Sequence, residues 1–96
     1  MSDLRFEWDA EKAEVNRRKH GVTFEEAASA FGDPNGKREY DQEHSTDEDR
    51  FAWIAMSWKG RTLSLIYTRR NEKIRIISAR RATKREIQRY TSEDQR

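Results

Sequence analysis

The side chains best able to do chemistry in this chain are basic, and they gather in its second half. Residues 50–96 carry 13 Lys and Arg against 4 Asp and Glu, a net charge of +9, while residues 1–49 carry 7 against 14, a net charge of −7. The formal net charge of +2 therefore hides two oppositely charged halves. Basic side chains on a rigid scaffold bind phosphate polymers. Ordinary solvated charge is the alternative, and the charge pattern favours phosphate recognition.

Acid–base groups are scarce by comparison. The chain has two histidines, His20 and His44, and no cysteine, which excludes disulfides, thiol nucleophiles and zinc–thiolate sites. The two histidines lack the spacing of metal ligands, and we expect no metal or other cofactor. His20 precedes Gly21 and is interpreted as the last residue of a helix. His44 follows an acidic loop, where a neutral imidazole could act as a general base or could brace the loop, and both alternatives are open.

Length and composition indicate a single folded domain, residues 1–96. Leu, Ile, Val and Phe together number 15, so the core is small, although ten aromatic residues add large buried areas. We expect a marginally stable domain that gains stability from a partner. The N-terminus has no apolar signal core and no apolar run approaches membrane-spanning length. A cytoplasmic protein that does not contact a membrane is therefore expected.

Alternation and capping signals predict the elements of the first half. Residues 4–8 alternate apolar and polar side chains, which predicts a short strand. A helix follows, with Asp9 as its N-cap, and runs to about Lys19, where Gly21 is its stop signal. A second helix begins at the capping box that Thr23 forms with the glutamate three residues later.

Four strands and one helix are predicted after residue 36. The strands are residues 37–41, a short edge strand, and residues 51–58, 61–68 and 73–80, with turns at 59–60 and 70–72. Thr83 and Glu86 form a capping box for a C-terminal helix. These elements predict an α+β fold in the order β-α-α-β-β-β-β-α. Its antiparallel sheet would have two N-terminal helices packed on one face and a C-terminal helix.

Four segments taken together resemble the BrnT family of toxins from type II toxin–antitoxin operons. They are FEWDAEKAEVNRRKHGVTFEEAASAF, DQEHSTDEDRFAWIAMS, GRTLSLIYTRR and RIISARRATKREIQRY. The resemblance covers about residues 6–90, and its specific pieces are KHGVTFEEA, the DxxHS before the first long strand, and RIISARRAT. The family is similar to the RelE superfamily of small ribonucleases. The resemblance therefore implies a RelE-like toxin domain that cleaves RNA and inhibits translation. It also implies a BrnA-type antitoxin, a DNA-binding protein that neutralises the toxin in a hetero-oligomer and represses the shared operon.

Cleavage of RNA by its own 2′-hydroxyl needs a base, a cation that stabilises the phosphorane, and an acid that protonates the leaving oxygen, but no metal. Arginine can only be the cation because it stays protonated. Since the RIISARR segment resembles the family's, it implies a phosphate role for Arg80 or Arg81 at the end of the last strand. The alternative is that one of them pairs with Glu86. Arg50, which opens the first long strand, is a further catalytic candidate.

Lys59, Arg61 and Arg75 are the candidates for RNA binding. Lys59 and Arg61 flank the hairpin turn and reach the site only if the strand register allows, and the alternative is a solvated hairpin tip. Related RelE-like sites combine Lys and Arg of the sheet with a C-terminal Tyr, which makes Tyr90 a catalytic candidate beside His44. Tyr90 also belongs to the apolar stripe of the last helix, so packing is the alternative role.

Two functions remain open on this basis. The resemblance favours an RNA-cleaving toxin that an antitoxin holds inactive. The scarcity of acid–base residues favours a non-catalytic module whose basic sheet binds a nucleic acid or a protein.

Overall fold

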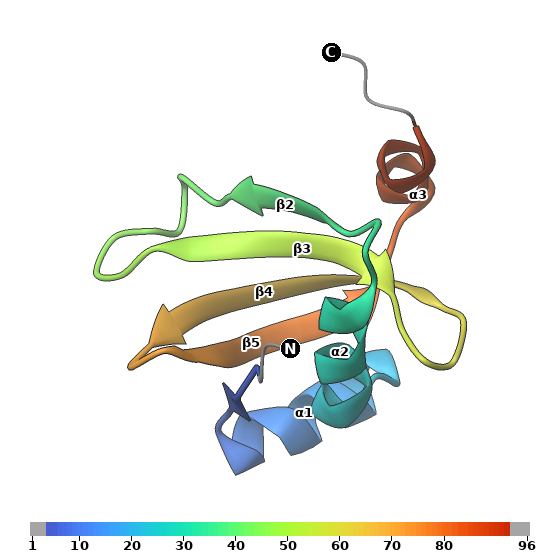
Figure 1. Cartoon of the computed structure of the whole chain (residues 1–96). Helices are drawn as coiled ribbons and strands as arrows, with labels where there is room; N and C mark the ends of the chain where they lie inside the picture. Colours follow the sequence, from blue (N-terminus) through green and yellow to red (C-terminus); the bar gives the residue numbers. More distant parts are fainter. Residues whose placement is uncertain (1–3, 93–96) are drawn as a thin grey trace.

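The computed structural model describes residues 4–92, which form one sheet and three α-helices (Figure 1). The elements are β1 (Phe6–Glu7), α1 (Ala10–His20), α2 (Phe24–Ser29), the 3₁₀ turn η1 (Ala30–Gly32), β2 (Lys37–Tyr40), β3 (Arg50–Met56), β4 (Thr62–Arg70), β5 (Lys73–Arg81) and α3 (Lys84–Thr91). The predicted β-α-α-β-β-β-β-α order is confirmed. Only β1 is much shorter than predicted.

The five strands are arranged in the order β1-β5-β4-β3-β2. Strands β2 to β5 pair antiparallel, as the predicted hairpins require. Strand β1 instead pairs parallel with β5, so that Phe6 lies opposite Ile74. The α+β class is confirmed, and the sheet is mixed rather than wholly antiparallel at this one edge. Alternation within a strand does not report the direction of its neighbour, so the sequence pattern could not reveal this pairing.

The helix ends follow the predicted capping signals. The Asp9 side chain accepts a hydrogen bond from the Lys12 N–H at 3.0 Å and begins α1. Gly21, with φ at 69°, ends α1 in the left-handed conformation that favours glycine. Thr83 and Glu86 form the full capping box of α3, each side chain accepting from the other residue's backbone N–H.

The hairpin between β3 and β4 has a three-residue loop, Trp58–Gly60, which corrects the predicted two-residue turn. The Ser57 N–H donates to the Arg61 carbonyl at 2.9 Å, and the Gly60 N–H donates to the Ser57 carbonyl at 2.9 Å. Gly60 has φ at 75°, as the last position of such a loop requires. The extra loop residue is Trp58, which leaves its side chain at the hairpin tip.

Strand β5 contains a β-bulge at Ile77. Ile66 of β4 lies opposite Ser78, whereas the next residue of β4, Tyr67, lies opposite Ile76. Ile77 therefore has no partner of its own, and the alternation of side chains between the two faces shifts by one residue beyond it.

The bulge brings two basic residues of β5 onto one face of the sheet. Arg75 lies opposite Thr68 of β4, and Arg80 lies opposite Ser64. Thr68 and Ser64 are four residues apart and so share a face of the sheet. Arg75 and Arg80 consequently share that face too, although they are five residues apart.

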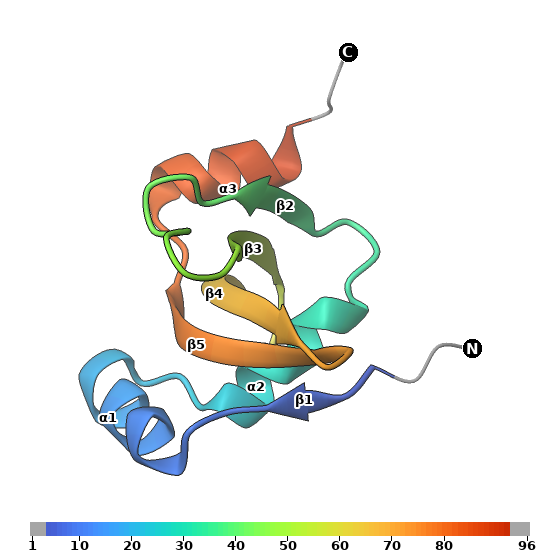
Figure 2. The same cartoon turned by 90° about the vertical axis from the view of Figure 1, so that its left-hand side faces the viewer.

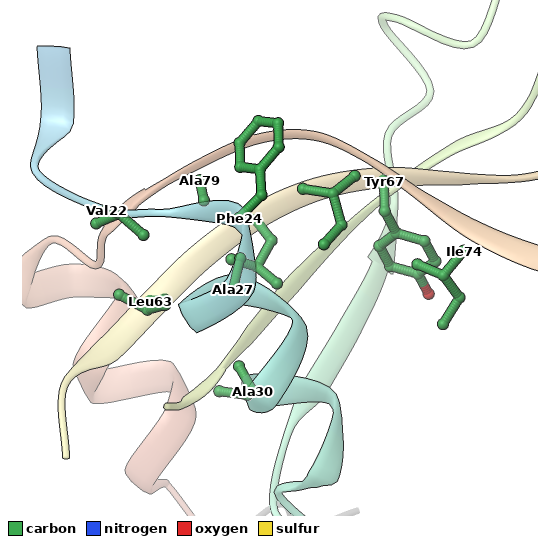
Figure 3. Packing of buried hydrophobic residues seen from close by; sticks show 11 residues of the cluster. Val22, Phe24, Ala27, Ala30, Leu63, Tyr67, Ile74 and Ala79 are labelled. Atoms are coloured by element: carbon green, nitrogen blue, oxygen red, sulfur yellow. The ribbon is translucent and has the colours of Figure 1, made fainter. Parts of the chain in front are cut away.

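The hydrophobic core lies between the other face of the sheet and the two N-terminal helices (Figure 3). Phe24 and Ala27 of α2 are fully buried with Leu63 and Leu65 of β4. This burial confirms that α2 packs on one face, and Ala13 of α1 packs against the same cluster. Full burial of a Leu or Phe side chain contributes about 1.5–3 kcal/mol. Burial of these side chains is the main stabilising force of the domain.

Aromatic rings extend the core toward β2. Phe31 stacks on Trp53 with ring centroids 5.5 Å apart, and it meets Tyr67 edge-on at 5.0 Å. The Trp53 ring N–H donates to the Ala30 carbonyl at 3.0 Å. A Cβ atom at Gly36 would lie 2.0 Å from the Trp53 ring, so this turn position has room only for glycine.

Helix α3 packs on the opposite face, beside β2 and β3. The Lys37 ammonium group donates to the backbone carbonyls of Arg89 and Ser92, and Arg89 forms an ion pair with Glu39. In Figure 2, α3 lies above the strands and α1 lies below them. Between these two helices, no helix of the described residues covers this face of β4 and β5.

Helix α1 lies along the edge of β5 where β1 ends. The buried Asn16 side chain donates to the Ala79 carbonyl at 2.8 Å and to the Val22 carbonyl at 3.0 Å, and it accepts from the Ala79 N–H at 3.1 Å. Asn16 thus takes the place of a neighbouring strand and satisfies backbone groups that the edge would leave unpaired. The C-terminal end of α1 is fixed against β5 as a result.

Candidate functional site

The predicted site residues fall into separate groups, and the Arg80 group is built on the C-terminal end of β5. The Arg80 guanidinium donates to both carboxylate oxygens of Glu86, at 2.8 and 3.0 Å. The Arg80 hydrogen bonds lower the pKa of Glu86 to about 2, although burial opposes the shift, and backbone donation from Thr83 lowers it further. The same contact raises the pKa of Arg80. The structure thus contains the pairing with Glu86 that was the alternative for this arginine, and its phosphate role stays a prediction.

The pairing leaves Arg80 partly available to a ligand. Its side chain is 44% exposed, and its position is fixed by Glu86 and by a hydrogen bond of 3.2 Å to the Arg81 carbonyl. Ser64 donates to the same Glu86 carboxylate at 3.3 Å. A guanidinium held in this way presents a fixed positive charge, the arrangement that stabilises an oxyanion with little reorganisation.

A cavity of about 190 Å³ adjoins Arg80 between the end of α1 and the face of the sheet. It is lined by His20, Ser64, Ile66, Ser78, Ala79 and Arg80. Sequence analysis missed His20, because its position before Gly21 indicated only a helix end. The signal that could have found it is its spacing of four residues from Asn16, which places both on one side of α1.

Arg81 does not join this cavity. It lies opposite the fully buried Leu63, and its direction alternates with that of Arg80, so the two point to opposite faces. The Arg81 side chain is exposed and makes no hydrogen bond or ion pair within residues 4–92. Its charge is free to attract an anion to the end of the strand.

His44 and Arg50 lie together at the other end of the sheet. They line a pocket of about 300 Å³ with Thr46, Asp47, Glu48 and Arg70. The His44 Nδ1 lies 3.0 Å from the Asp41 carboxylate, and this contact orients the imidazole. Arg50 lies opposite Thr68 whereas Arg80 lies opposite Ser64, so about 13 Å of strand separates these positions. The two groups start from opposite ends of one face, and their joint action in a single catalytic centre stays a prediction.

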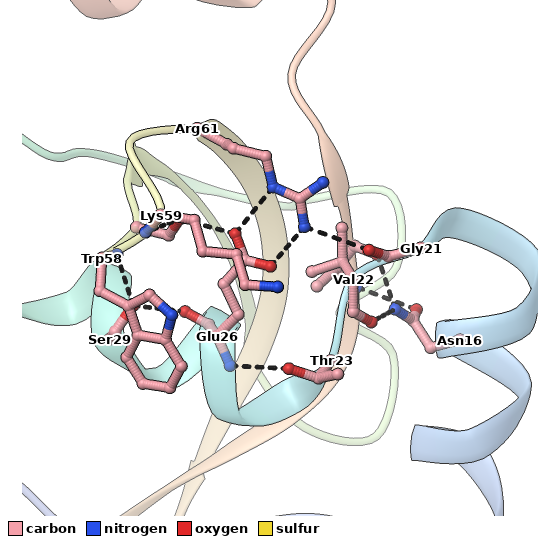
Figure 4. A network of polar contacts seen from close by, with 11 residues as sticks. Asn16, Gly21, Val22, Thr23, Glu26, Ser29, Trp58, Lys59 and Arg61 are labelled. Atoms are coloured by element: carbon pink, nitrogen blue, oxygen red, sulfur yellow. Dashed lines mark hydrogen bonds and ion pairs between the residues drawn. The ribbon is translucent and has the colours of Figure 1, made fainter.

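Arg61 is bound within a buried network at the base of the hairpin (Figure 4). Its guanidinium donates to both carboxylate oxygens of Glu26, with the Nε–Oε2 distance at 3.0 Å, and to the Gly21 carbonyl at 3.1 Å. The hydrogen bonds from Arg61 lower the pKa of Glu26 against the opposing effect of burial. Ser57 donates to the same carboxylate at 2.6 Å. These contacts give Arg61 a structural role, and RNA binding by it stays a prediction.

Lys59 lies at the tip of the hairpin, beside a tryptophan that is 66% exposed, Trp58. The Trp58 N–H donates to the Ser29 hydroxyl at 3.0 Å, and the Lys59 N–H donates to the Ser57 hydroxyl at 3.2 Å. The backbone of the tip is therefore held against α2 while both side chains are exposed. RNA binding by Lys59 also stays a prediction.

The last two candidates each have a local partner. The Arg75 guanidinium lies 3.4 Å from the Glu7 carboxylate of β1. The Tyr90 hydroxyl donates to the Asp33 carboxylate at 2.6 Å, and this hydrogen bond, with burial, raises the pKa of Tyr90 to about 12. Burial opposes ionisation of Asp33, but donors that include Tyr90 outweigh it and lower the pKa of Asp33. Tyr90 is thus distant from the His44 group and bound to a different loop.

Residues 4–92 contain no group of three or more His, Asp or Glu side chains placed to hold a metal ion. Their helices are all too short or too polar to span a lipid bilayer.

Comparison with known proteins assigns the chain to a family. Residues 8–86 match the model of a family described as the ribonuclease toxin, BrnT, of type II toxin–antitoxin systems. The fold is similar to the 1.1 Å crystal structure of the Brucella abortus ribonuclease toxin BrnT, with a TM-score of 0.57 and 23% sequence identity over 85% of this chain and all of that one. No curated protein sequence matched the chain. Because the match spans nearly the whole of the described fold, the chain belongs to the BrnT family, the ribonuclease toxins of type II toxin–antitoxin systems.

Proposed function

We propose that this toxin cleaves RNA without a metal ion at the Arg80 end of the sheet. This location is supported by the ion pair of Arg80 with Glu86, which lies beside a cavity whose lining residues include no Asp or Glu. A phosphate in the cavity would meet the guanidinium edge that Glu86 leaves exposed. Arg80 would then stabilise the negative charge that builds up on the phosphorane.

The His44 end of the sheet fits a phosphate less well. The pocket there is lined by Asp47 and Glu48 as well as by Arg50 and Arg70, and Arg70 is already paired with Glu48 at 3.2 Å. Carboxylates around a pocket repel an RNA backbone, so the electrostatic potential of this pocket opposes RNA binding. Arg50 and His44 therefore form the second location to be tested, after Arg80.

In the cell, we infer that cleavage inhibits translation in the cytoplasm and that a BrnA-type antitoxin prevents it. The family supplies the existence of an antitoxin partner. The BrnA type, its binding to DNA and its repression of the shared operon follow from the resemblance of the four sequence segments and form part of this proposal. The basic second half of the chain supports RNA as the substrate.

Expression of the chain in bacteria with the Arg80→Ala and Arg85→Ala variants tests the proposal. Arg85 is the matched control, because it is an arginine of α3 next to Glu86, is exposed and makes no ion pair within residues 4–92. The parent chain and Arg85→Ala should arrest growth and protein synthesis, and the antitoxin should restore both. Arg80→Ala should lower RNA cleavage about 100- to 1,000-fold, as removal of an oxyanion stabiliser does.

Cleavage assays with purified protein separate the chemistry from the phenotype. Activity should persist in EDTA and should leave 2′,3′-cyclic phosphate and 5′-hydroxyl ends. Loss of activity in EDTA would refute metal independence, and full activity of folded Arg80→Ala would refute the location. RNA binding without any cleavage by the parent chain would instead support a binding module.

A further inference from the structure

The proposed site has a cation but lacks an obvious proton acceptor. Glu86 is a poor base, because a carboxyl group with a pKa of about 2 holds a proton weakly and its oxygens already accept from Arg80. The hydroxyls of Ser64 and Ser78 do not accept protons at neutral pH. Among the described residues that line the cavity, this leaves His20 as the one side chain whose type exchanges protons near neutral pH.

The backbone that carries His20 is held in place from two directions. On one side, Asn16 lies one helical turn before His20 and is hydrogen-bonded to the backbone of Ala79. His20 therefore lies on the side of α1 that faces β5. On the other side, the carbonyl of Gly21, the residue that follows His20, accepts from Arg61 at 3.1 Å. Since Arg61 is itself fixed by the buried Glu26, the end of α1 is tied to both the sheet and the hairpin. Such rigidity is what a group that must meet a reacting atom requires.

His20 also lies where two cavities meet. A second cavity, of about 360 Å³, runs between α1 and β5 and is lined by Glu11, Lys12, Val15, Asn16, Lys19, His20, Ile77 and Ser78. It shares His20 and Ser78 with the cavity beside Arg80. The two cavities are therefore adjacent along a groove between α1 and β5, with Arg80 lining one and Lys12 and Lys19 lining the other. A strand of RNA in this groove would place a phosphate at Arg80 and continue past His20 toward Lys19 and Lys12.

We propose that His20 is a catalytic residue of this toxin, the general base that activates the ribose 2′-hydroxyl of an RNA strand bound in the groove between α1 and β5. This inference rests on the proposed function. In the step, the neutral imidazole of His20 takes the proton of the 2′-hydroxyl as O2′ forms a bond to phosphorus. The bond from phosphorus to O5′ then breaks, and O5′ takes a proton from water or from the protonated imidazole. The products are a 2′,3′-cyclic phosphate and a 5′-hydroxyl.

Several charged groups lie around His20. They are Glu11, Lys12 and Lys19 on α1, Arg80 on β5, and Glu86 of α3, which is bound to Arg80. A general base must be unprotonated to accept a proton, so a histidine in this role makes cleavage rise with pH on the acidic side of neutrality.

The test measures single-turnover RNA cleavage by the full chain from pH 5 to 9, for the parent, His20→Gln, His20→Ala and Arg18→Gln. Arg18 is the matched control, because it is an exposed residue of α1 whose contact is a surface ion pair with Glu14. Both His20 variants should lose at least about 100-fold in rate and should lose the rise with pH on the acidic side. Arg18→Gln should keep the parent rate, and imidazole added to His20→Ala should restore part of its activity.

Several outcomes would overturn the inference. If the parent chain cleaves RNA and folded His20→Gln matches it in rate and pH profile, His20 is not the base, while the proposed function stands. If His44→Gln abolishes cleavage and His20→Gln does not, the base lies at the other end of the sheet. If the folded parent chain cleaves no RNA, with or without ribosomes, both the inference and the proposed function fail. Circular dichroism of each variant shows that it is folded, and imidazole rescue cannot arise from a purely structural defect.

Discussion

Glu26 and Arg61 form a two-point ion pair in which the Glu26 side chain is completely buried. The pair joins α2 to the first residue after the hairpin loop, 35 residues later in the chain. Ser57 completes the set of donors to the carboxylate. A buried charge with this many partners stabilises the fold only while all of them remain, because its desolvation is offset by their combined contacts.

Glu26→Gln should therefore be strongly destabilising. The substitution keeps the shape but removes the negative charge, which leaves the Arg61 guanidinium, 24% exposed, without its counter-charge. Breaking one side of a buried pair costs about 3–5 kcal/mol. Urea denaturation should show a lower midpoint, whereas the exposed neighbour Glu25, changed to Gln, should be nearly neutral. Equal midpoints for the two variants would show that the pair contributes no net stability.

Glu86 should make stability depend on pH in the acid range. Its pKa in the folded chain is about 2, below the ordinary value of 4.5. The contribution is therefore complete above about pH 4.5 and is lost as the pH falls toward 2. Glu86→Gln should lower the free energy of unfolding by about 1–2 kcal/mol at pH 7, since the partly exposed Arg80 weakens the pair. The difference from the parent should disappear near pH 2, and a difference that does not change with pH would contradict this assignment.

Gly36→Ala should disturb the aromatic part of the core. The new Cβ would lie 2.0 Å from the Trp53 ring, so the ring must move from its stack on Phe31. Overpacking of this kind costs about 1–3 kcal/mol. Thermal melting and near-ultraviolet circular dichroism report the two effects. Gly32→Ala is the matched control, because nothing lies within 4 Å of a Cβ at that position, and it should leave the tryptophan signal unchanged.

The free domain should be only marginally stable, and its antitoxin should raise its melting temperature. The core contains few apolar residues, while folding must order the backbone of nearly the whole chain. A partner that binds only the folded state adds stability that grows with the logarithm of its free concentration relative to its Kd. An antitoxin bound over the basic face should also compete with RNA. Unchanged melting together with undisturbed RNA binding would mean that neutralisation uses another surface.

The sequence predicted those elements whose signals are local. Asp9 and Gly21 bound α1, and Thr83 begins α3, because a capping side chain or a glycine acts within three or four residues of itself. Alternation predicted the long strands for the same reason. The order of the elements, and with it the α+β class, followed from these local signals.

The candidate site was predicted less completely, because it depends on contacts between distant residues. The bond between Asn16 and Ala79 spans 63 positions and decides where the end of α1 lies. Without it, His20 has no visible relation to Arg80. Arg61 was placed among the RNA-binding residues because it is basic and flanks the hairpin turn, yet its partner Glu26 belongs to another element. Sequence patterns show which side chains are charged, and packing determines which charges meet.

The unpaired Ile77 gives β5 a second possible register against β4. If Ile77 paired with Ile66, every later residue of β5 would slip by one place, and Arg80 would lie opposite the buried Leu63 on the core face. A chain without Ile77 has no such alternative, because Ile76 and Ser78 already lie opposite the neighbouring residues Tyr67 and Ile66. The shortened strand would keep Arg80 beside Glu86 and would hold it there in a single register.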